Sequence, residues 1–147
     1  MTAAADTTTP RAVVETFLKL MTTGDNDDRS KALELFAEDA TLWIAGSLPF
    51  SGTRNGKAEI IEKVYSRAGG RMVPGSKSLW IRNIVAEGNQ VVAEWTSRRT
   101  TLAGKDYQND LCGVFEIENG KIKVMREYLD TLHAKTMQWP TEETKPA

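Results

Sequence analysis

The chain of 147 residues has the usual size of one compact domain, and 40% apolar and 27% charged residues are ordinary for a soluble globular protein. Its formal net charge of −1 lacks the basic excess by which proteins bind nucleic acids. No apolar run approaches the roughly 20 residues that a membrane-spanning helix needs, and the opening MTAAADTTTP lacks the features of a secretory signal. We therefore expect a cytoplasmic protein that binds neither nucleic acid nor membrane.

Cysteine and histidine are scarce, and this limits the chemistry of the chain. Cys112 is the one cysteine, so an internal disulfide and a cysteine-rich zinc site are excluded. His133 is the one histidine, which excludes a histidine-rich metal cluster. We expect no metal and no cofactor, a buried and inert thiol at Cys112, and a structural or exposed imidazole at His133.

The first half of the chain carries the signals of three helices. Thr9-Pro10 has the residue types of an N-cap and a first helical position, and apolar residues at helical spacing follow as far as Gly24. A second, short helix is predicted from about 29 to 37. The third is expected to begin at the capping residue Asn55 and to end at Gly69.

Strand signals begin between the second and third helices, at 39–45, and dominate after Pro74. Four runs rich in β-branched and aromatic residues follow, separated by short glycine-containing turns: 77–86, 90–102, 107–117 and 121–129. The segment 130–139 is helical or irregular. Helices followed by an antiparallel meander predict one α+β domain, 10–139, between a disordered N-terminal tail, 1–9, and a polar C-terminal tail, 140–147.

Two phrases of the sequence resemble a known family. They are LFAEDATLWIAGSLPFSGTRNGKAEI, at 35–60, and GVFEIENGKIKVMREYLD, at 113–130. Both are similar to the SnoaL-like and ketosteroid-isomerase-like proteins of the nuclear transport factor 2-like superfamily, and the resemblance extends over about 10–137. It implies a cone-shaped, curved antiparallel sheet packed on three N-terminal helices, with a ligand cavity on its concave face. It also implies a homodimer formed by the convex side of the sheet.

The resemblance transfers some of the family's active-site residues and not others. Asp130 falls where enzymes similar to limonene epoxide hydrolase and SnoaL-type cyclases place a carboxylate. The Arg and Asp of the epoxide hydrolases fall on Trp95 and Ser97, and their Tyr and Asn fall on Leu42 and Ile44. The base of the steroid isomerases also falls near Ile44. The residue sets of both mechanisms are therefore largely missing.

Strand alternation supplies a separate set of candidate residues. Tyr128 and Asp130 share one face of the last strand, and Asn109 is polar on an otherwise apolar wall of the preceding strand. We predict Asp130 as the acid/base, with its carboxyl pKa raised by apolar surroundings, and Tyr128 and Asn109 as hydrogen-bond donors. The predicted pocket walls are Trp43, Trp95, Ser97, Leu111 and Phe115.

Each of these residues also has a structural interpretation. Asp130 can instead cap the C-terminal segment or pair with Arg126. The tryptophans can be plain core residues. Arg98 and Arg99 fit best as a solvated basic edge, although Arg99 on the inner face would suit a carboxylate ligand.

The leading functional hypothesis is a cofactor-independent acid/base enzyme of the isomerase or cyclase type. It would act on a small hydrophobic carbonyl compound such as a polyketide or terpenoid. The alternative is a non-catalytic small-molecule-binding or dimerisation module with the same fold, and the third is an epoxide hydrolase with a rearranged triad. In each case the sequence predicts a small hydrophobic partner molecule and a homodimer.

Overall fold

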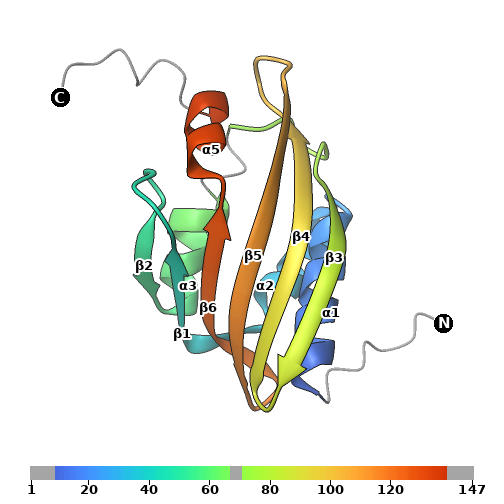
Figure 1. Cartoon of the computed structure of the whole chain (residues 1–147), viewed down its shortest axis with the longest axis vertical. Helices are drawn as coiled ribbons and strands as arrows, with labels where there is room; N and C mark the ends of the chain where they lie inside the picture. Colours follow the sequence, from blue (N-terminus) through green and yellow to red (C-terminus); the bar gives the residue numbers. More distant parts are fainter. Residues whose placement is uncertain (1–8, 67–70, 139–147) are drawn as a thin grey trace.

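The computed structural model describes residues 9–66 and 71–138, and in this part of the chain six strands form one curved sheet with helices against it (Figure 1). The strands are β1 Phe36–Ile44, β2 Gly52–Asn55, β3 Ser78–Glu87, β4 Gln90–Thr100, β5 Asp106–Glu118 and β6 Lys121–Leu129. The helices are α1 Pro10–Thr22, α2 Asn26–Leu33, α3 Lys57–Ile60 and α5 Thr131–Gln138. The predicted α+β fold class is confirmed. The predicted tails lie outside the described residues, except for Thr9.

The start of α1 follows the predicted capping chemistry. The Thr9 hydroxyl accepts a hydrogen bond from the Ala12 N–H at 3.1 Å, and Pro10 occupies the first position, where no N–H is needed. The apolar stripe of this helix is buried against the sheet: Val13, Val14, Phe17, Leu18 and Met21. The helix is held by this packing, because one amphipathic face supplies most of the stability of a short helix.

The next two helices differ from their predicted bounds. α2 begins at Asn26 because the Asp25 carboxylate accepts from the N–H groups of Asp27 and Asp28, at 2.8 and 3.0 Å. The chain is already extended at Phe36, so this helix ends early. Asn55, predicted to cap the third helix, is instead the last residue of β2, a strand that was not predicted. α3 starts after Gly56 and continues in a π-helical turn, Ile61–Tyr65.

The order of the sheet is β2-β1-β6-β5-β4-β3. β3 to β6 form the predicted antiparallel meander, with bounds within two residues of the prediction. β1, however, pairs with β6 in parallel, so the sheet is not wholly antiparallel. Register shifts occur in the β3–β4 pairing, in the β5–β6 pairing and along β1, and such irregularities bend strands.

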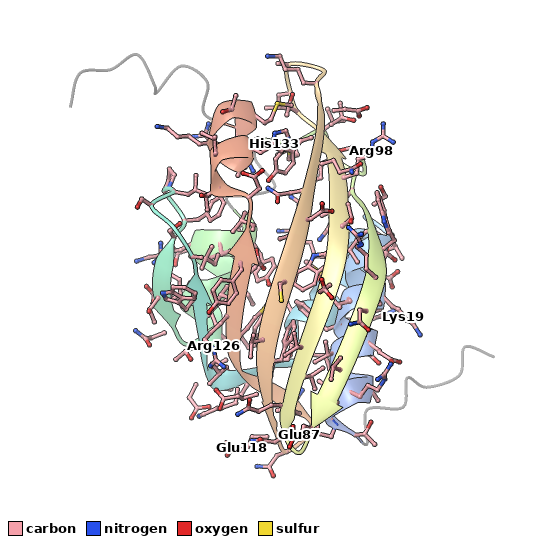
Figure 2. The ribbon with its side chains drawn as sticks, viewed as in Figure 1. Lys19, Glu87, Arg98, Glu118, Arg126 and His133 are labelled. Carbon is pink, nitrogen blue, oxygen red and sulfur yellow. The ribbon has the colours of Figure 1, made fainter. Side chains whose placement is uncertain are left out.

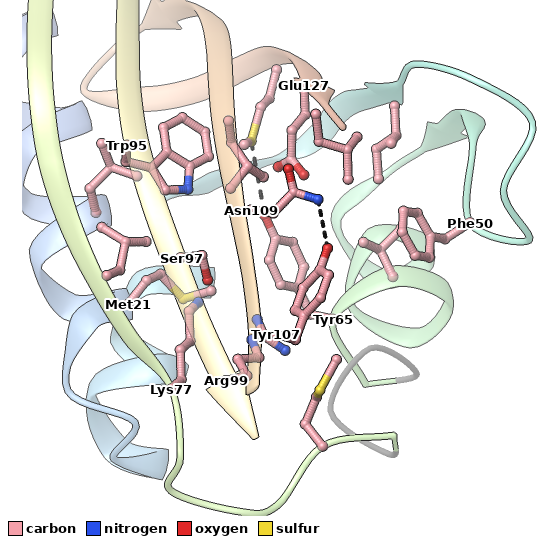
Figure 3. Close-up of a pocket in the computed structure, with 18 of the residues that line it drawn as sticks. Met21, Phe50, Tyr65, Lys77, Trp95, Ser97, Arg99, Tyr107, Asn109 and Glu127 are labelled. Atoms are coloured by element: carbon pink, nitrogen blue, oxygen red, sulfur yellow. Dashed lines mark hydrogen bonds between the residues drawn. The ribbon is translucent and has the colours of Figure 1, made fainter. Parts of the chain in front are cut away.

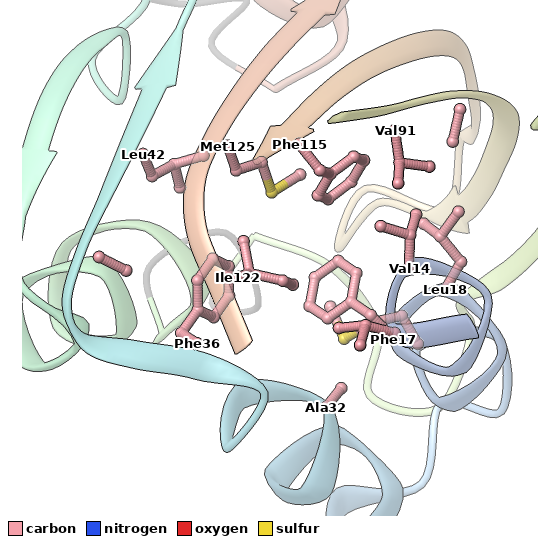
Figure 4. Packing of buried hydrophobic residues seen from close by; sticks show 14 of the residues in the cluster. Val14, Phe17, Leu18, Ala32, Phe36, Leu42, Val91, Phe115, Ile122 and Met125 are labelled. Carbon is pink, nitrogen blue, oxygen red and sulfur yellow. The ribbon is translucent and has the colours of Figure 1, made fainter. Parts of the chain in front are cut away.

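An aromatic cluster forms the centre of the main core, between α1 and the sheet (Figure 4). The ring of Phe17 meets Phe36 and Phe115 edge-on, with centroids 5.5 and 6.2 Å apart. A second, smaller cluster lies beneath α5: Leu48, Met72, Tyr107 and Ala134. In the described helices, no segment is both long enough and apolar enough to cross a bilayer.

Candidate active site

A cavity of about 120 Å³ lies where the two core clusters meet, on the concave side of the sheet (Figure 3). Its walls are mostly apolar and come from α1, the π-helical turn and the inner faces of the strands. Polar side chains enter it from the π-helical turn, the segment before β3, the sheet and α5. They are Tyr65, Lys77, Ser97, Arg99, Tyr107, Asn109, Glu127 and Gln138.

Glu127 supplies the carboxylate of this cavity. In the sheet it lies between Gly113 of β5 and Ile44 of β1, so its side chain projects from the middle of the concave face. Among the described residues, no basic side chain forms an ion pair with it. Burial raises the pKa of Glu127 to about 7, although the positive charges of Lys77 and Arg99 act in the opposite direction.

Lys77 and Arg99 form the cationic side of the cavity. Lys77 comes just before β3 and Arg99 lies on β4, and both are half-buried. Burial, together with the nearby charges of Arg99 and Arg29 and against the opposing effect of Glu127, lowers the pKa of Lys77 to about 7. Burial likewise lowers the pKa of Arg99 from its ordinary value. The site therefore holds a carboxyl and an amine that both exchange protons near neutral pH.

Two tyrosines place hydroxyl groups in the same space. Tyr65 comes from the π-helical turn, and burial raises the pKa of its phenol far above the usual range, which keeps it protonated. Its hydroxyl meets the Met125 sulfur at 3.9 Å. The Tyr107 hydroxyl accepts a hydrogen bond from Asn109 Nδ2 at 2.8 Å, and its ring stacks on His133 with centroids 5.4 Å apart.

Three of the predicted pocket walls and one predicted hydrogen-bond donor line the cavity: Trp95, Ser97 and Leu111, and the donor Asn109. Asn109 also joins the end of β6, because Nδ2 donates to the Asp130 carbonyl at 2.9 Å and Oδ1 accepts from the Asp130 N–H at 3.0 Å. Its amide is thus occupied by neighbouring groups of the protein. Phe115 lies deeper than predicted, fully buried in the main core rather than in the cavity wall.

Asp130, Tyr128 and Trp43 lie away from the cavity, which corrects their predicted placement. Asp130 is exposed, and its carboxylate accepts from the His133 N–H at 2.9 Å at the start of α5, in agreement with the capping alternative. Tyr128 and Trp43 meet edge-on, with centroids 5.3 Å apart, on the outer face of the sheet. Side chains alternate along β6, and those that face the cavity belong to Met125, Glu127 and Leu129. Tyr128 therefore faces outward.

The two adjacent arginines of β4 point to opposite sides. Arg98 is exposed and pairs with Asp106 on the outer face, as the solvated interpretation predicts (Figure 2). Arg99 does not lie at a solvated edge, because alternation turns its side chain into the cavity.

Cys112 is half-buried on the outer face, where burial raises the pKa of its thiol. Arg126 pairs with Glu116 at 3.0 Å rather than with Asp130.

Sequence reasoning missed Glu127, Lys77 and Tyr65. For Glu127 a signal exists, because a glutamate between Met125 and Leu129 at two-residue spacing must share their face. For Tyr65 the decisive feature is the π-helical turn, and for Lys77 it is the path of the chain into β3. Neither has a sequence pattern. In the described residues no three His, Cys, Asp or Glu side chains come together as a metal site would require.

Comparison with known families agrees with this geometry. The model of the SnoaL-like domain matches residues 14–125. The chain belongs to the SnoaL-like family. The match covers most of α1, all of α2 and α3, β1 to β5, and β6 as far as Met125, whereas Glu127 and α5 lie beyond it. No match was found among curated proteins.

Solved structures show the same fold. An NTF2-like protein from Burkholderia thailandensis has a TM-score of 0.76 at 20% identity over 90% of this SnoaL-like chain and 98% of its own. TerC, co-crystallised with polyporic acid, has a TM-score of 0.73 at 20% identity over 88% and 98%. Bal32a, from a soil-derived mobile gene cassette, has a TM-score of 0.70 at 23% identity over 86% and 95%. At these identities the likeness establishes the fold alone.

Proposed function

We propose that the protein is a cofactor-independent acid/base catalyst of the isomerase or cyclase type, with Glu127 as the base in place of Asp130. The observation that carries the proposal is a carboxylate in an apolar cavity that faces two cationic side chains and two hydroxyl groups. A base with a pKa near the working pH can both accept and return a proton efficiently. The substrate class is a small, largely apolar carbonyl compound.

The reaction follows from the position of each group. The Glu127 carboxylate takes a proton from the carbon next to a carbonyl, and the electron pair of that C–H bond moves toward the carbonyl oxygen. Lys77, Arg99 and the Tyr65 hydroxyl are the groups in the cavity that can stabilise the resulting enolate oxygen. Return of the proton from Glu127 to another carbon of the enolate completes an isomerisation. In a cyclisation, the enolate carbon attacks a second carbonyl carbon of the same substrate, the π electron pair of that C=O bond moves to its oxygen, and this oxygen takes the proton from Glu127.

The size of the cavity limits the reacting part of the substrate. A cavity of about 120 Å³ is comparable to the engineered protein cavity of about 150 Å³ that admits benzene. The reacting portion is therefore about one six-membered ring. Trp95 and Leu111 supply flat, apolar walls for such a ring.

The test is exchange of carbon-bound hydrogen in D₂O, followed by NMR for a panel of cyclic ketones and 1,3-dicarbonyl compounds. Wild type should accelerate exchange, and Glu127→Gln should lower the rate by about 10²- to 10⁴-fold, the usual contribution of a general base. Glu116→Gln is the matched control, because this glutamate faces outward and pairs with Arg126. Full exchange by Glu127→Gln would overturn the assignment. Binding without exchange in wild type would favour a non-catalytic binding module.

A further inference from the structure

A second cavity, of about 350 Å³, adjoins the first. The two share five lining residues: Met21, Tyr65, Met72, Lys77 and Arg99. Among the described residues, the rest of its lining comes from the end of α1, the start of α2, Ser66 and the segment before β3. A ligand with its ring beside Glu127 can therefore extend past Lys77 and Arg99 into this second space.

Positive charge gathers around the second cavity. Arg29 of α2 joins Lys77 and Arg99 in its lining, and the three are close enough that the charges of Arg29 and Arg99 disfavour the charged form of Lys77. Arg29 uses one guanidinium nitrogen to donate to the Tyr65 carbonyl, and a guanidinium has five N–H donors in all. No other described residue accepts a hydrogen bond from this guanidinium, which leaves its other donors for a ligand.

The negative groups nearby do not balance these charges. Asp25 also lines the second cavity, but its carboxylate already accepts from the N–H groups of Asp27 and Asp28 at the start of α2. Glu127 lies in the first cavity and acts on Lys77 and Arg99. Two carboxylates thus face three basic side chains, and among the described residues none of the three forms an ion pair. Half-buried cations without an anionic partner are costly, so this arrangement favours binding of an anion.

We propose that the substrate carries an anionic group, a carboxylate or a phosphate, which binds in the second cavity between Arg29, Lys77 and Arg99. This deepens the proposed function and rests on it for the position of the reacting carbonyl beside Glu127. Guanidinium groups bind both anions through paired hydrogen bonds, so the two chemistries share one site. A neutral analogue lacks these charge-assisted bonds and is expected to bind more weakly.

Binding of three probes tests the proposal by calorimetry near neutral pH: phenylacetate, phenyl phosphate and the neutral methyl phenylacetate. At least one anion should bind about tenfold or more tightly than the ester, a difference of about 1.4 kcal/mol. Arg29→Gln and Arg99→Gln should each remove most of this preference. Arg98→Gln is the matched control, because the adjacent arginine faces outward and pairs with Asp106, and it should leave binding unchanged. The anion that binds more tightly identifies the chemistry of the group.

Three results would overturn the anion site. They are an ester that binds as tightly as the anions, a loss of anion affinity in Arg98→Gln equal to that in Arg99→Gln, or no binding of either anion. Thermal unfolding of each variant separates loss of binding from loss of the fold, and the wild-type preference for anions needs no variant at all. Glu127→Gln separates the two proposals. It should keep or strengthen anion binding while it loses exchange, since it removes a negative charge from the cavity. Retained exchange would refute the role of Glu127 and leave the anion site intact.

Discussion

Gly113 lies directly opposite Glu127 in the pairing of β5 with β6, and the ring of Trp95 covers the space that a side chain at Gly113 would fill. A Cβ atom built on Gly113 would lie 2.9 Å from the Trp95 ring and 2.7 Å from the ring of Phe115, closer than real Cβ atoms approach. The missing side chain therefore lets an aromatic wall reach across β5 toward Glu127.

Gly113→Ala should consequently disturb both the fold and the site. The new methyl group has rings on two sides and must displace one of them, which typically costs about 1–3 kcal/mol. Urea unfolding measures the loss of stability, and the exchange assay should show a lower rate as Trp95 moves. Cys112→Ala, at the next position but on the outer face, should leave the rate unchanged. An unaltered rate in Gly113→Ala would show that this wall does not position the substrate.

The rate of exchange should depend on pH through Glu127. A base must be ionised to accept a proton, so kcat/KM should rise as pH increases through about 7, where burial places the pKa of this carboxyl. Lys77 holds that pKa down, and Lys77→Met should therefore move the acid limb of the profile to higher pH. Lys105→Met, at an exposed position in the β4–β5 turn, should leave it in place. If the acid limb does not move in Lys77→Met, the charge of Lys77 does not influence the pKa of Glu127.

Stability should also follow the ionisation of Glu127. Its folded pKa of about 7 lies above the ordinary 4.5, so the folded state binds more protons and the free energy of unfolding falls as pH rises between these values. Glu127→Gln abolishes this cost. Its gain in the free energy of unfolding over wild type should be larger at pH 8 than at pH 5, by on the order of 1–3 kcal/mol. Urea unfolding at the two pH values measures it. An equal difference at both would refute the raised pKa.

Asp130 should contribute to stability rather than to the chemistry. Asp130→Ala loses the cap of α5 and should lower the free energy of unfolding by about 1 kcal/mol, whereas Asp130→Asn keeps a capping side chain and should be nearly neutral. Both variants should retain the exchange rate, because the carboxylate lies outside the cavity. A large loss of exchange in a stable Asp130→Asn variant would instead identify Asp130 as the base.

We expect a homodimer formed by the outer face of the sheet. Val85, Val92 and Val114 lie side by side across β3, β4 and β5, and the first two are 57% and 38% exposed. An apolar row on an open sheet face is typical of an interaction surface. Val92→Lys should shift the protein from dimer to monomer in sedimentation, whereas Val73→Lys, 40% exposed but in the lining of the second cavity and not in this row, should not. A monomeric wild type would exclude this assembly.

The parts of the fold that were predicted from sequence are those with local signals. Thr9 and Pro10 mark the start of α1, and glycine-containing turns separate the strands of the meander. β2 was missed because four residues beside a glycine carry too little alternation to stand out from a loop. The parallel pairing of β1 with β6 joins segments distant in the chain, and no local pattern encodes it.

The candidate site was predicted only in part for a similar reason. Along β4 and β5, apolar neighbours establish the inner face, so Trp95 and Asn109 were placed correctly. On β6 the resemblance drew attention to Asp130, although Glu127 shares the face of Met125. Tyr65 and Lys77 reach the cavity through a π-helical turn and a loop, whose course depends on tertiary packing.

The parallel pairing of β1 with β6 also bears on the order in which the molecule assembles. β3 to β6 connect through short turns and can associate as soon as each hairpin exists, whereas β1 must wait for β6 across more than half of the chain. During synthesis β1 can pair with β2, and Phe36 can pack on Phe17 of α1, but the other edge of β1 has no partner until β6 has left the ribosome. In that interval Phe36 and Leu42 are apolar groups without their final cover, so this early strand is where aggregation of the nascent chain should begin.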